Sequence, residues 1–554
     1  MAASRGAVTT LFGRGAAARL PPGQSFAAIT AVLGKPDASS MPSPLSHPSG
    51  KATLVTVPDR KERVVILGSG WAGYTFARSL NPNKFDRIMI SPRSYFVFTP
   101  LLAGTAVGTL EMRAVLEPVR RLGLDGFYQG WADDIDFARK TVRVEANTSD
   151  DLASRTRLMM KRSSDASEKG PLFEVTYDKL VIAVGSYSQT FGIEGVREYA
   201  NFLRDIGDAR KIRMKVLQLF EKAALPLTTD EERRKLLYFA IVGGGPTGIE
   251  FAAELHDLIK EDLSRIYPEL MRFVRITVFD VAQKVLPMFD QTLAQYAMDT
   301  FRREGISVKT GHHLTRIRPD SECEGCFKLN IKEYGVEEMS AGIVVWSTGL
   351  MQNPLVEKLS CRKFTVPPIP PEVKSLVELQ LETDPRTGGL ITDSYLRVNV
   401  TPQTAQSEPS VHNLHTGPLA DVYAIGDCAV IPGAALPATA QVASQKAAHL
   451  AKRLNRGDAN EKEFRFRNWG TMTYLGSWTA IHQSSADELK GWAAWILWRT
   501  AYLTRSMSVR NKIMVPIYWA ITFFYSTLLL PRTIETTAHD TRQGVGYDAK
   551  RRPF

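Results

Sequence analysis

A glycine-rich segment near the middle of the chain has the spacing of a dinucleotide-binding turn. In residues 240–255, Gly243, Gly245 and Gly248 follow an apolar run and precede a helix-forming run. In a G-x-G-x-x-G turn, the first glycine makes the tight turn, the second lets a pyrophosphate approach the backbone, and the third packs helix against strand. The N-terminus of the helix then offers unpaired N–H groups to the phosphates. The pattern therefore predicts a dinucleotide site.

The same pattern occurs earlier in the chain. Gly68, Gly70 and Gly73 follow the apolar run at residues 64–67, and they precede the middle segment by 175 residues. One copy alone also fits an ordinary strand-to-helix turn. Two copies in one chain favour two bound dinucleotides.

The strand after each glycine turn helps to identify the ligand. The strand after the second turn ends at Asp280, where a carboxylate accepts hydrogen bonds from a ribose 2′-OH and repels a 2′-phosphate. This favours NAD over NADP, although an ordinary surface aspartate remains an alternative. The spacing is longer than usual, so we expect an extended helix in between. After the first turn the equivalent strand ends in Ser91-Pro92-Arg93, without an acid, which leaves the first ligand open.

Three further buried strands end in glycine. They end at Gly185, at Gly349, and at Gly426 followed by Asp427. Strand-to-glycine endings of this kind, alternating with helical segments, predict an α/β fold with parallel strands.

A helix is predicted from about Leu436, opened by Pro437. Gln441 and Gln445 are four residues apart and project from one face of this helix. Exposed, solvated glutamines are the simplest interpretation of the pair.

Length and composition indicate a globular protein of two or three domains. The chain has 554 residues, 44% hydrophobic and 23% charged, with a net charge of +11. The central part has no basic run interleaved with aromatic residues, so a nucleic-acid partner is not predicted. Arginines near both ends fit a targeting segment and an anionic membrane surface better. Four cysteines are too few for a disulfide framework, and the Cys323/Cys326 pair lacks nearby histidines, so no metal site is predicted.

The N-terminal residues read as a targeting segment. Residues 1–36 contain several arginines, serines and alanines and no acid, which is typical of a mitochondrial transit peptide; a disordered basic tail is the alternative. A Pro- and Ser-rich linker follows at 37–57. Residues 146–170 read as a polar inserted loop, and residues 362–416 as loops with a short strand pair.

The C-terminal hundred residues are aromatic and basic. Trp492, Trp495 and Trp498 with nearby arginines predict a helix that lies in a membrane interface, anchored by its tryptophans. Residues 513–530 are uncharged but contain Pro516, so a membrane span is a weaker alternative, and a soluble dimer interface is another.

Together these segments resemble a known family, the type II (alternative, rotenone-insensitive) NADH:ubiquinone oxidoreductases of fungal mitochondria. The resemblance covers roughly residues 60–525. Its motifs are the stretch Ser91-Pro-Arg-Ser-Tyr-Phe-Val-Phe-Thr-Pro-Leu-Leu, the segment 190–196, the second glycine turn, Gly426-Asp427, and Ala440-Gln-Val-Ala-Ser-Gln445. Residues 146–170 and 362–416 and the tail after Tyr525 depart from the family pattern. No calcium-binding loop is present in the sequence.

The resemblance implies a function for each motif. FAD would bind non-covalently at Gly68, Gly70, Gly73, Ser91, Pro92, Arg93, Thr99, Gly185, Gly426 and Asp427, with Asp427 holding the ribityl chain. NADH would bind at Gly243, Gly245, Gly248, Glu250, Asp280 and Gly349, with Glu250 near the nicotinamide. Ubiquinone would bind at Gln441 and Gln445. Hydride transfer between two aligned cofactors requires no catalytic acid or base from the protein.

The expected architecture is α/β, with two Rossmann-like dinucleotide-binding domains and a C-terminal membrane-anchoring region. The expected segments are 1–58 (transit peptide and linker), 59–190 (FAD-binding, first part), 191–350 (NADH-binding), 351–455 (FAD-binding, second part) and 456–554 (membrane-associated). The protein would pass two electrons from NADH to ubiquinone at the mitochondrial inner membrane without pumping protons. A homodimer is an open alternative to a monomer.

Other classes on this fold fit the sequence less well. A disulfide reductase needs a cysteine pair beside the flavin, and residues 60–320 contain no cysteine. A sulfide:quinone oxidoreductase needs active cysteines, for which Cys326 and Cys361 are the candidates. A nicotinamide-sensing mitochondrial flavoprotein like apoptosis-inducing factor is the non-enzymatic alternative, and fast oxidation by a quinone analogue separates it from an enzyme.

Overall fold

The computed structural model describes residues 60–147, 170–365, 378–402, 417–434, 436–484, 487–505 and 507–528. The predicted transit peptide and linker lie outside these ranges. So do most of the inserted loop at 146–170 and two parts of the segment 362–416.

The largest sheet in the described residues has the order β19-β20-β22-β23-β8-β1-β2-β5-β6-β7. Its central strands β23, β8, β1, β2 and β5 are parallel neighbours, and the strands on either side are antiparallel. Val64, Val65 and Ile66 in β1 are fully buried, as expected of a parallel strand covered on both faces. The bounds are β1 (Glu62–Leu67), β2 (Phe85–Ser91), β5 (Gly126–Asp136), β6 (Thr141–Ala146), β7 (Leu172–Thr176), β8 (Lys179–Ile182), β19 (Lys363–Thr365), β20 (Glu378–Leu381), β22 (Arg397–Pro402) and β23 (Pro418–Ala424).

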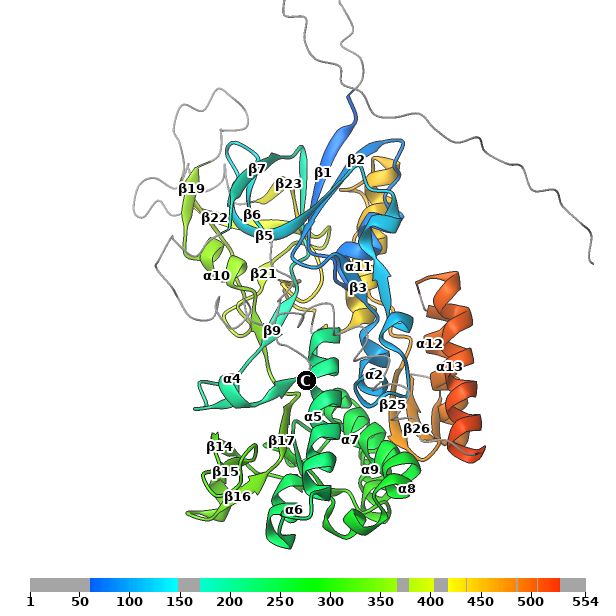
Figure 1. The fold of residues 1–554 in the computed structure, drawn as a ribbon. Coiled ribbons are helices and arrows are strands. Elements are labelled where there is room, and N and C mark those ends of the chain that lie inside the picture. The colour runs from blue at the N-terminus through cyan, green and yellow to red at the C-terminus, as the bar shows by residue number, and fades with distance from the viewer. Residues whose placement is uncertain are drawn as a thin grey trace, which may run out of the picture. The chain divides into compact units, whose positions relative to one another are not determined.

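Helices α1 (Trp71–Ser79) and α11 (Ala440–Arg456) pack against each other beside this sheet (Figure 1). The helix that was predicted to open at Pro437 begins three residues later, at Ala440. The Thr439 side chain caps it there by accepting a hydrogen bond from the Val442 amide.

Segment 362–416 was predicted as loops with a short strand pair, and its described part does contain the antiparallel pair β20–β22, but the prediction missed that these strands join the main sheet. Strands β19, β20 and β22 extend the main sheet at one edge. Buried leucines and valines at alternate positions of β20 and β22 account for the pairing. Prolines and polar residues elsewhere in the segment masked this short alternation.

A second sheet contains parallel strands in the order β10-β17-β11-β12-β13. The predicted long connection between β11 and β12 is confirmed: α7 continues as a π-helical turn and two short helical segments. The bounds are β10 (Asn201–Phe202), β11 (Tyr238–Val242), β12 (Arg275–Asp280), β13 (Ser307–Thr310), β17 (Ile343–Trp346), α5 (Ile206–Ala224), α6 (Asp230–Leu236), α7 (Pro246–Leu258), η5 (Ile259–Leu263), α8 (Ser264–Ile266), η6 (Pro268–Phe273) and α9 (Gln291–Arg303).

The C-terminal described residues form a three-stranded antiparallel sheet and two helices. These are β25 (Thr471–Gly476), β26 (Thr479–Gln483), β27 (Glu488–Gly491), α12 (Trp492–Arg505) and α13 (Val509–Leu528). Strand β25 packs on α7, α12 packs on β26, and α12 and α13 lie side by side (Figure 1).

Shorter elements connect these parts. They are β3 (Tyr95–Val97), β4 (Leu116–Pro118), β9 (Ser186–Ser188), β14 (Leu314–Pro319), β15 (Phe327–Ile331), β16 (Glu338–Ala341), β18 (Leu350–Gln352), β21 (Leu390–Ile391), β24 (Ala429–Val430), η1 (Thr99–Leu101), α2 (Leu102–Val107), η2 (Met112–Ala114), η3 (Val119–Leu122), α4 (Val196–Tyr199), η7 (Lys332–Tyr334) and α10 (Pro354–Ser360).

Candidate functional site

The first glycine turn joins β1 to α1. Gly68 has φ +104°, and a Cβ there would lie 2.4 Å from the carbonyl oxygen of Ala183. A Cβ on Gly73 would lie 1.9 Å from the Gly68 carbonyl oxygen, so both positions require glycine. A Cβ on Gly70 would meet no atom within 4 Å. The turn is therefore tight on one side and open at its middle glycine, the shape that admits a pyrophosphate.

Three other predicted residues lie at the ends of β8, which pairs with β1, and of β23, which pairs with β8. Gly185 follows β8, and Gly426 and Asp427 follow β23. Because neighbouring parallel strands end at one edge of a sheet, these residues lie along the same edge as Gly68. The Ser186 hydroxyl donates a hydrogen bond of 3.4 Å to Asp427.

Buried charges surround Asp427. Burial raises the pKa of its carboxyl group, and the nearby Arg204 and Lys446 partly offset that shift. Arg204 donates to the Ser186 hydroxyl at 3.4 Å, and burial lowers its pKa against the opposing effect of Asp427. The other terminal nitrogen of Arg204, Nη1, is buried without a hydrogen-bond partner in the structure. An added acceptor would satisfy it.

The segment after β2 also faces this region. Ser91, at the end of β2, shares a hydrogen bond of 2.8 Å with Ser69 of the glycine turn. The next basic residue, Arg93, forms an ion pair of 2.9 Å with Asp205, the N-cap residue of α5. The Pro92 carbonyl accepts a hydrogen bond of 3.1 Å from the side-chain amide of Asn147.

Thr99 lies at the start of η1 and accepts a hydrogen bond of 2.9 Å from the indole N–H of Trp71. Trp71 directly follows Gly70, so this bond ties the predicted flavin segment to the first glycine turn.

These residues fit FAD. The open middle glycine leaves space for the pyrophosphate. The carboxyl group of Asp427 can accept a hydrogen bond from a hydroxyl group of the cofactor, and the unpartnered Arg204 nitrogen can donate one to a phosphate or carbonyl oxygen. Arg204 was not predicted from the sequence, because nothing in its local pattern distinguishes it from a helix-flanking surface arginine.

The second glycine turn, between β11 and α7, repeats the same geometry. Gly243 has φ +117°, and a Cβ there would lie 2.8 Å from the Ser347 hydroxyl. A Cβ on Gly248 would lie 2.0 Å from the Gly243 carbonyl oxygen, whereas one on Gly245 would meet nothing within 4 Å. Gly349 follows the adjacent strand β17. The turn is therefore shaped for a second dinucleotide.

Asp280 ends β12, the other neighbour of β11. Its carboxylate accepts hydrogen bonds from the backbone amides of Gly244 and Ala282. These bonds hold the carboxylate against the glycine turn, where the ribose of a dinucleotide binds in this class of fold.

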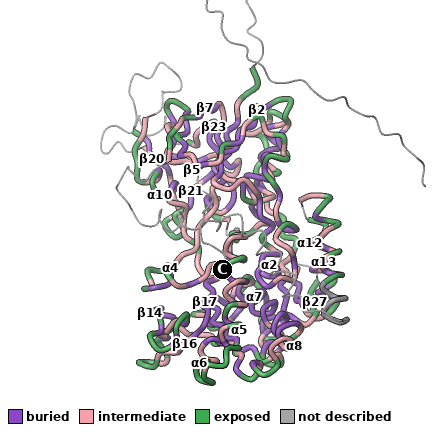
Figure 2. Tube along the Cα trace, in the orientation of Figure 1, coloured by how far each residue is buried: buried purple, intermediate pink, exposed green. Residues whose placement is uncertain are grey.

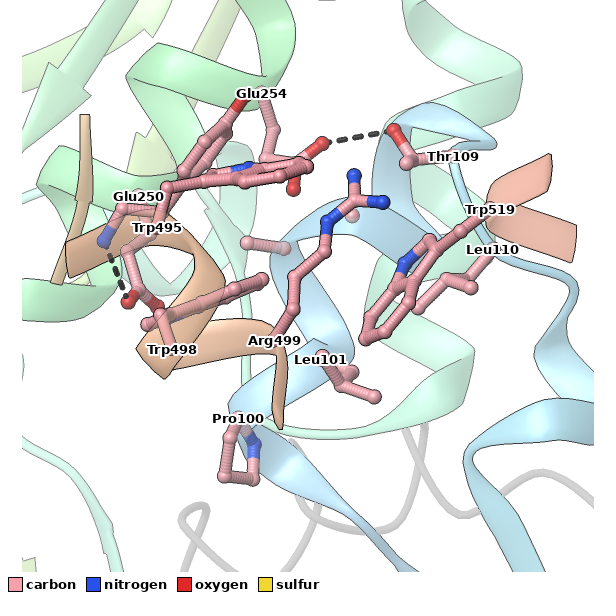
Figure 3. A pocket seen from close by; sticks show the side chains of 13 residues that line it. Pro100, Leu101, Thr109, Leu110, Glu250, Glu254, Trp495, Trp498, Arg499 and Trp519 are labelled. Carbon is pink, nitrogen blue, oxygen red and sulfur yellow. Dashed lines mark hydrogen bonds between the residues drawn. The ribbon is translucent and has the colours of Figure 1, made fainter. Parts of the chain in front are cut away.

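A small pocket lies where α7 meets α2, β25 and the two C-terminal helices (Figure 3). It brings together three parts of the chain that are far apart in sequence. Its lining residues are Pro100, Leu101, Ala103, Gly104, Thr109, Leu110, Glu250, Glu254, Tyr474, Trp495, Trp498, Arg499 and Trp519.

Two carboxyl groups of α7 face this pocket. Glu250 accepts a hydrogen bond of 3.2 Å from the Tyr474 amide, and Glu254 accepts one of 2.7 Å from the Thr109 hydroxyl. Burial raises the pKa of Glu250 to about 8, the Tyr474 amide lowers it, and the charge of Glu254 raises it further. Glu250 is therefore a protonated acid at neutral pH. Glu254, four residues later on the same helix, was missed, although this spacing was visible in the sequence.

Arg499 closes one side of the pocket. Its guanidinium lies 4.4 Å from the ring centre of Trp495 and 4.4 Å from that of Trp519, so it is held between two indoles (Figure 3). This contact joins α12 to α13 beside the two α7 acids.

The prediction that Trp492, Trp495 and Trp498 all act as surface anchors is wrong for two of them. Trp495 and Trp498 are buried and line the pocket, and Trp492 is 65% exposed. The helix places residues 495 and 498 on its inner face, and the tryptophan composition alone could not separate the two faces.

Gln441 and Gln445 lie outside this pocket and bind the protein backbone. Gln445 donates to the Arg467 carbonyl at 2.8 Å and accepts from the Arg467 amide at 3.0 Å. Gln441 accepts from the Trp469 amide at 3.3 Å and donates to the Gly470 carbonyl at 3.4 Å. Both side chains thus hold the chain that leads into β25.

Lys446, the next residue of α11, was also missed. It is 2% exposed, and its ammonium group donates to the Ala429 carbonyl at 3.1 Å. Burial lowers its pKa to about 8, and the nearby Cys428 and Asp427 raise it. The lysine thereby ties α11 to the loop that carries Asp427.

An exposed apolar stripe runs along α13. Val509, Ile513, Ile517 and Ile521 are four residues apart and between 43% and 75% exposed, and α12 adds Trp492, which is 65% exposed. Figure 2 shows exposed segments along α12 and α13. We call these five residues the apolar stripe. In the part of the chain that the structure describes, no helix has the length and apolarity that a membrane span needs.

The cysteine pair is buried in the turn between β14 and β15. The sulfur atoms of Cys323 and Cys326 lie 2.7 Å apart. The described residues hold no group of three or more histidines, cysteines or acids suited to a metal ion. Neither Cys326 nor the exposed Cys361 lines the pocket.

Comparisons with known proteins agree with this geometry. Residues 62–365 match the model of the pyridine nucleotide-disulphide oxidoreductase family, and residues 469–526 match the NDH2 C-terminal domain. The chain is 38% identical to a probable NADH dehydrogenase of Dictyostelium discoideum, over 84% of this chain and 90% of the relative. It is 32% identical to external NADH-ubiquinone oxidoreductase 2, mitochondrial, of Saccharomyces cerevisiae, over 84% and 81%. A solved structure of NDH2 from Plasmodium falciparum in complex with NADH aligns with TM-score 0.68 and 25% identity, covering 84% of this chain and 99% of that one.

Proposed function

The chain belongs to the type II NADH dehydrogenases, the alternative NADH-ubiquinone oxidoreductases, and from this we propose how it passes electrons from NADH through FAD to ubiquinone. We place the transfer at the surface of the mitochondrial inner membrane, without proton pumping. The observation that carries the proposal is the pocket in which Glu250, whose pKa is raised by burial, meets residues 100–110 and the C-terminal helices.

FAD is held by the first glycine turn (Gly68, Gly70, Gly73), by the segment Ser91-Pro92-Arg93 with Thr99, and by Gly185, Gly426 and Asp427. FAD, when bound, supplies the two-electron chemistry that connects NADH to the quinone. Arg204 supplies a buried donor to it, and Lys446 steadies the Asp427 loop. The chain's own task at this site is alignment.

NADH is held by Gly243, Gly245, Gly248 and Gly349, with Glu250 near the nicotinamide. Asp280 accepts the ribose hydroxyls and repels a 2′-phosphate, since its carboxylate is fixed at the turn by two backbone amides.

Ubiquinone enters between α2 and the C-terminal helices and reaches the pocket near Glu250. The pocket is small, so Arg499 or Trp519 moves aside when the quinone head enters. The aromatic lining suits a planar ring, and Glu250 holds a proton within the pocket. Gln441 and Gln445 bind quinone through their amides only if the backbone at 467–470 releases them; otherwise they support the site by holding that backbone.

Membrane association depends on the apolar stripe. The stripe is flanked by the exposed Arg510 and Lys512, a pattern suited to an anionic lipid surface. The arginine-rich residues 1–36 support delivery to mitochondria, as do the names of the relatives. N-terminal sequencing of protein taken from mitochondria tests this: the mature chain begins after about residue 36, and an intact Met1 contradicts the assignment.

Stopped-flow spectroscopy tests the proposed electron path. The purified protein is yellow; NADH bleaches the flavin absorbance, and a short-chain ubiquinone restores it within the turnover time. An apoptosis-inducing-factor-like protein would bleach and then recover slowly with the same quinone. In sealed liposomes, a pH dye inside the vesicle reports no acidification beyond that from leak. Transmembrane proton movement coupled to turnover would contradict the non-pumping assignment.

A further inference from the structure

Quinone reduction by NADH consumes one proton for each turnover. The balanced reaction is NADH + H⁺ + Q → NAD⁺ + QH₂. A pocket lined by aromatic side chains needs a path for that proton once a bound quinone excludes bulk water from it. The inference below rests on the proposed binding of ubiquinone in this pocket.

Three acids follow one another along the inner face of α7. Glu250, Glu254 and Asp257 occupy positions i, i+4 and i+7 and are all buried. Three buried carboxyl groups on one helix face are costly unless they have partners or a function. The first two line the pocket, and the third lies one turn farther along the helix.

Tyr474 connects the third acid to the pocket. Its hydroxyl donates a hydrogen bond of 2.6 Å to Asp257, and Tyr474 itself lines the pocket. The other Asp257 oxygen accepts a bond of 3.0 Å from the Ser477 amide. Asp257 is therefore held against the β25–β26 turn, and the oxygen that binds the tyrosine also lies 3.3 Å from the Ser477 amide.

From Asp257, polar groups continue to the surface. His256 Nδ1 lies 3.7 Å from Asp257, and His256 Nε2 lies 3.7 Å from Glu304, the C-cap residue of α9. Glu304 pairs at 2.7 Å with Lys260, whose side chain is 56% exposed. A small rotation of the imidazole brings either nitrogen within hydrogen-bond distance of its carboxylate.

We propose that Tyr474, Asp257 and His256 form a proton-uptake route from the surface of the NADH-binding part to the quinone pocket. His256 takes a proton at Nε2 from water beside Glu304 and releases the Nδ1 proton to Asp257. Protonated Asp257 then donates to the Tyr474 oxygen as the tyrosine hydroxyl proton passes to the acceptor in the pocket. Asp257 and Tyr474 end in their starting protonation states, and one proton enters for each quinol that forms. His256 ends neutral with its proton on Nε2 instead of Nδ1, so its imidazole must turn over before the next cycle.

The charged groups around the route are few. Tyr474 faces Asp257 and Glu254 on α7 and Arg499 on α12, and burial raises its pKa most. Asp257 faces His256 and Tyr474, and His256 faces Glu304 at the C-terminal end of α9. Tyr474 therefore stays protonated until a strong base forms beside it in the pocket.

The test compares two electron acceptors. Ferricyanide takes electrons one at a time and releases a proton overall, whereas ubiquinone consumes one. With full-length holoprotein, Tyr474→Phe and Asp257→Asn are expected to leave ferricyanide reduction unchanged. With a short-chain ubiquinone the turnover falls about ten-fold or more, the loss grows as pH rises, and the solvent deuterium effect increases.

Matched variants separate a proton path from a structural bond. Tyr267→Phe removes a hydrogen bond of 2.7 Å between a tyrosine and the carboxylate of Glu221, outside the route. It should leave the turnover with both acceptors unchanged. Asp257→Glu keeps a carboxylate and should restore part of the quinone turnover. The route is refuted, and the bond is structural, if Tyr474→Phe lowers the turnover with ferricyanide and with ubiquinone equally. The same holds if it lowers quinone turnover without a change in the pH profile or the isotope effect.

A variant that fills the pocket tests the placement of the quinone. Thr109→Trp should raise the KM for ubiquinone several-fold and spare ferricyanide. If it does so while Tyr474→Phe and Asp257→Asn behave as wild type, the route alone is wrong. If Thr109→Trp also leaves the quinone kinetics unchanged, the pocket assignment fails, and the route fails with it.

Discussion

The side-chain amide of Gln445 forms a pair of hydrogen bonds with the backbone of Arg467. It donates to the carbonyl at 2.8 Å and accepts from the amide at 3.0 Å, as a neighbouring strand would. Gln441, one turn earlier, repeats the pairing with Trp469 and Gly470. The flavin-side helix α11 is thereby joined to the segment that enters β25.

Replacing Gln445 with leucine should therefore loosen this junction. Each lost hydrogen bond lowers the free energy of unfolding by about 1 kcal/mol. Chemical denaturation measures that loss, and the double variant with Gln441→Leu should add to it. Quinone turnover should fall while ferricyanide reduction is preserved.

Methionine at 445 serves as a control, since it keeps the length of the side chain and removes its hydrogen bonds. If either leucine variant lost quinone binding at full stability, the glutamines would contact ubiquinone directly. Unchanged stability together with unchanged turnover would contradict both roles.

Asp280→Asn should narrow the preference for NADH over NADPH by about ten-fold, the effect of removing about 1.4 kcal/mol of charge repulsion. Asn keeps one oxygen that can accept from the Gly244 or Ala282 amide, so the turn should survive. Lys284, near in sequence, donates to the Phe289 carbonyl and is held away from the phosphate. The ratio of kcat/KM for the two donors is the measurement. Equal use of both donors by the wild type would overturn the assignment of Asp280.

Much of the fold could be predicted from local patterns. The two glycine turns, the glycine-ended strands and the long connection before Asp280 each carry their signal within a few residues. The attachment of β19, β20 and β22 to the main sheet could not be predicted, because β22 pairs with β23 across a polar segment and short alternation is a weak signal.

In the pocket, too, features with a local sequence signal could be predicted and those that depend on remote packing could not. Glu250 was associated with the nicotinamide from its motif, yet its pKa is raised by burial in a pocket whose lining includes residues remote in sequence, among them Tyr474 and Trp498. Arg499 gave no signal, since an arginine among tryptophans reads as an interfacial anchor. Tertiary packing turned an expected surface helix face into a pocket wall.

Glu250 should give the protein a pH-dependent stability. Its pKa is raised from 4.5 in the unfolded chain to about 8 in the folded one, so the folded state binds this proton more tightly. Stability therefore falls as pH rises from about 4.5 to about 8, with a slope of about 1.4 kcal/mol per pH unit at most, and levels off above that range.

Glu250→Gln should remove this part of the slope, which unfolding by denaturant at pH 5, 6, 7 and 8 measures. Glu357→Gln, on the exposed face of α10, is the control and should keep the wild-type slope. If the Glu250→Gln and wild-type curves stay parallel, Glu250 does not hold a proton in the folded protein.

The apolar stripe should bind membranes through its isoleucines. Ile513 and Ile517 are 57% and 43% exposed, and the opposite face of α13 buries Val515 and Trp519. Glutamate at both isoleucine positions removes apolar contact of about 2 kcal/mol per side chain and adds repulsion from anionic lipid. Flotation with cardiolipin-containing vesicles should show membrane binding weakened about 100-fold or more.

Val336→Glu controls for added negative charge at an apolar site. Val336 is 96% exposed and lies outside the C-terminal region, so this variant should float like wild type. The Ile513/Ile517 variant should still reduce ferricyanide and a water-soluble quinone, because neither isoleucine lines the pocket, whereas reduction of membrane-dissolved ubiquinone should fall with vesicle binding. If vesicle binding persists in the double variant, the stripe is not the lipid contact. If the soluble acceptors are lost as well, the substitutions have disturbed α13, and with it the contact between Trp519 and Arg499.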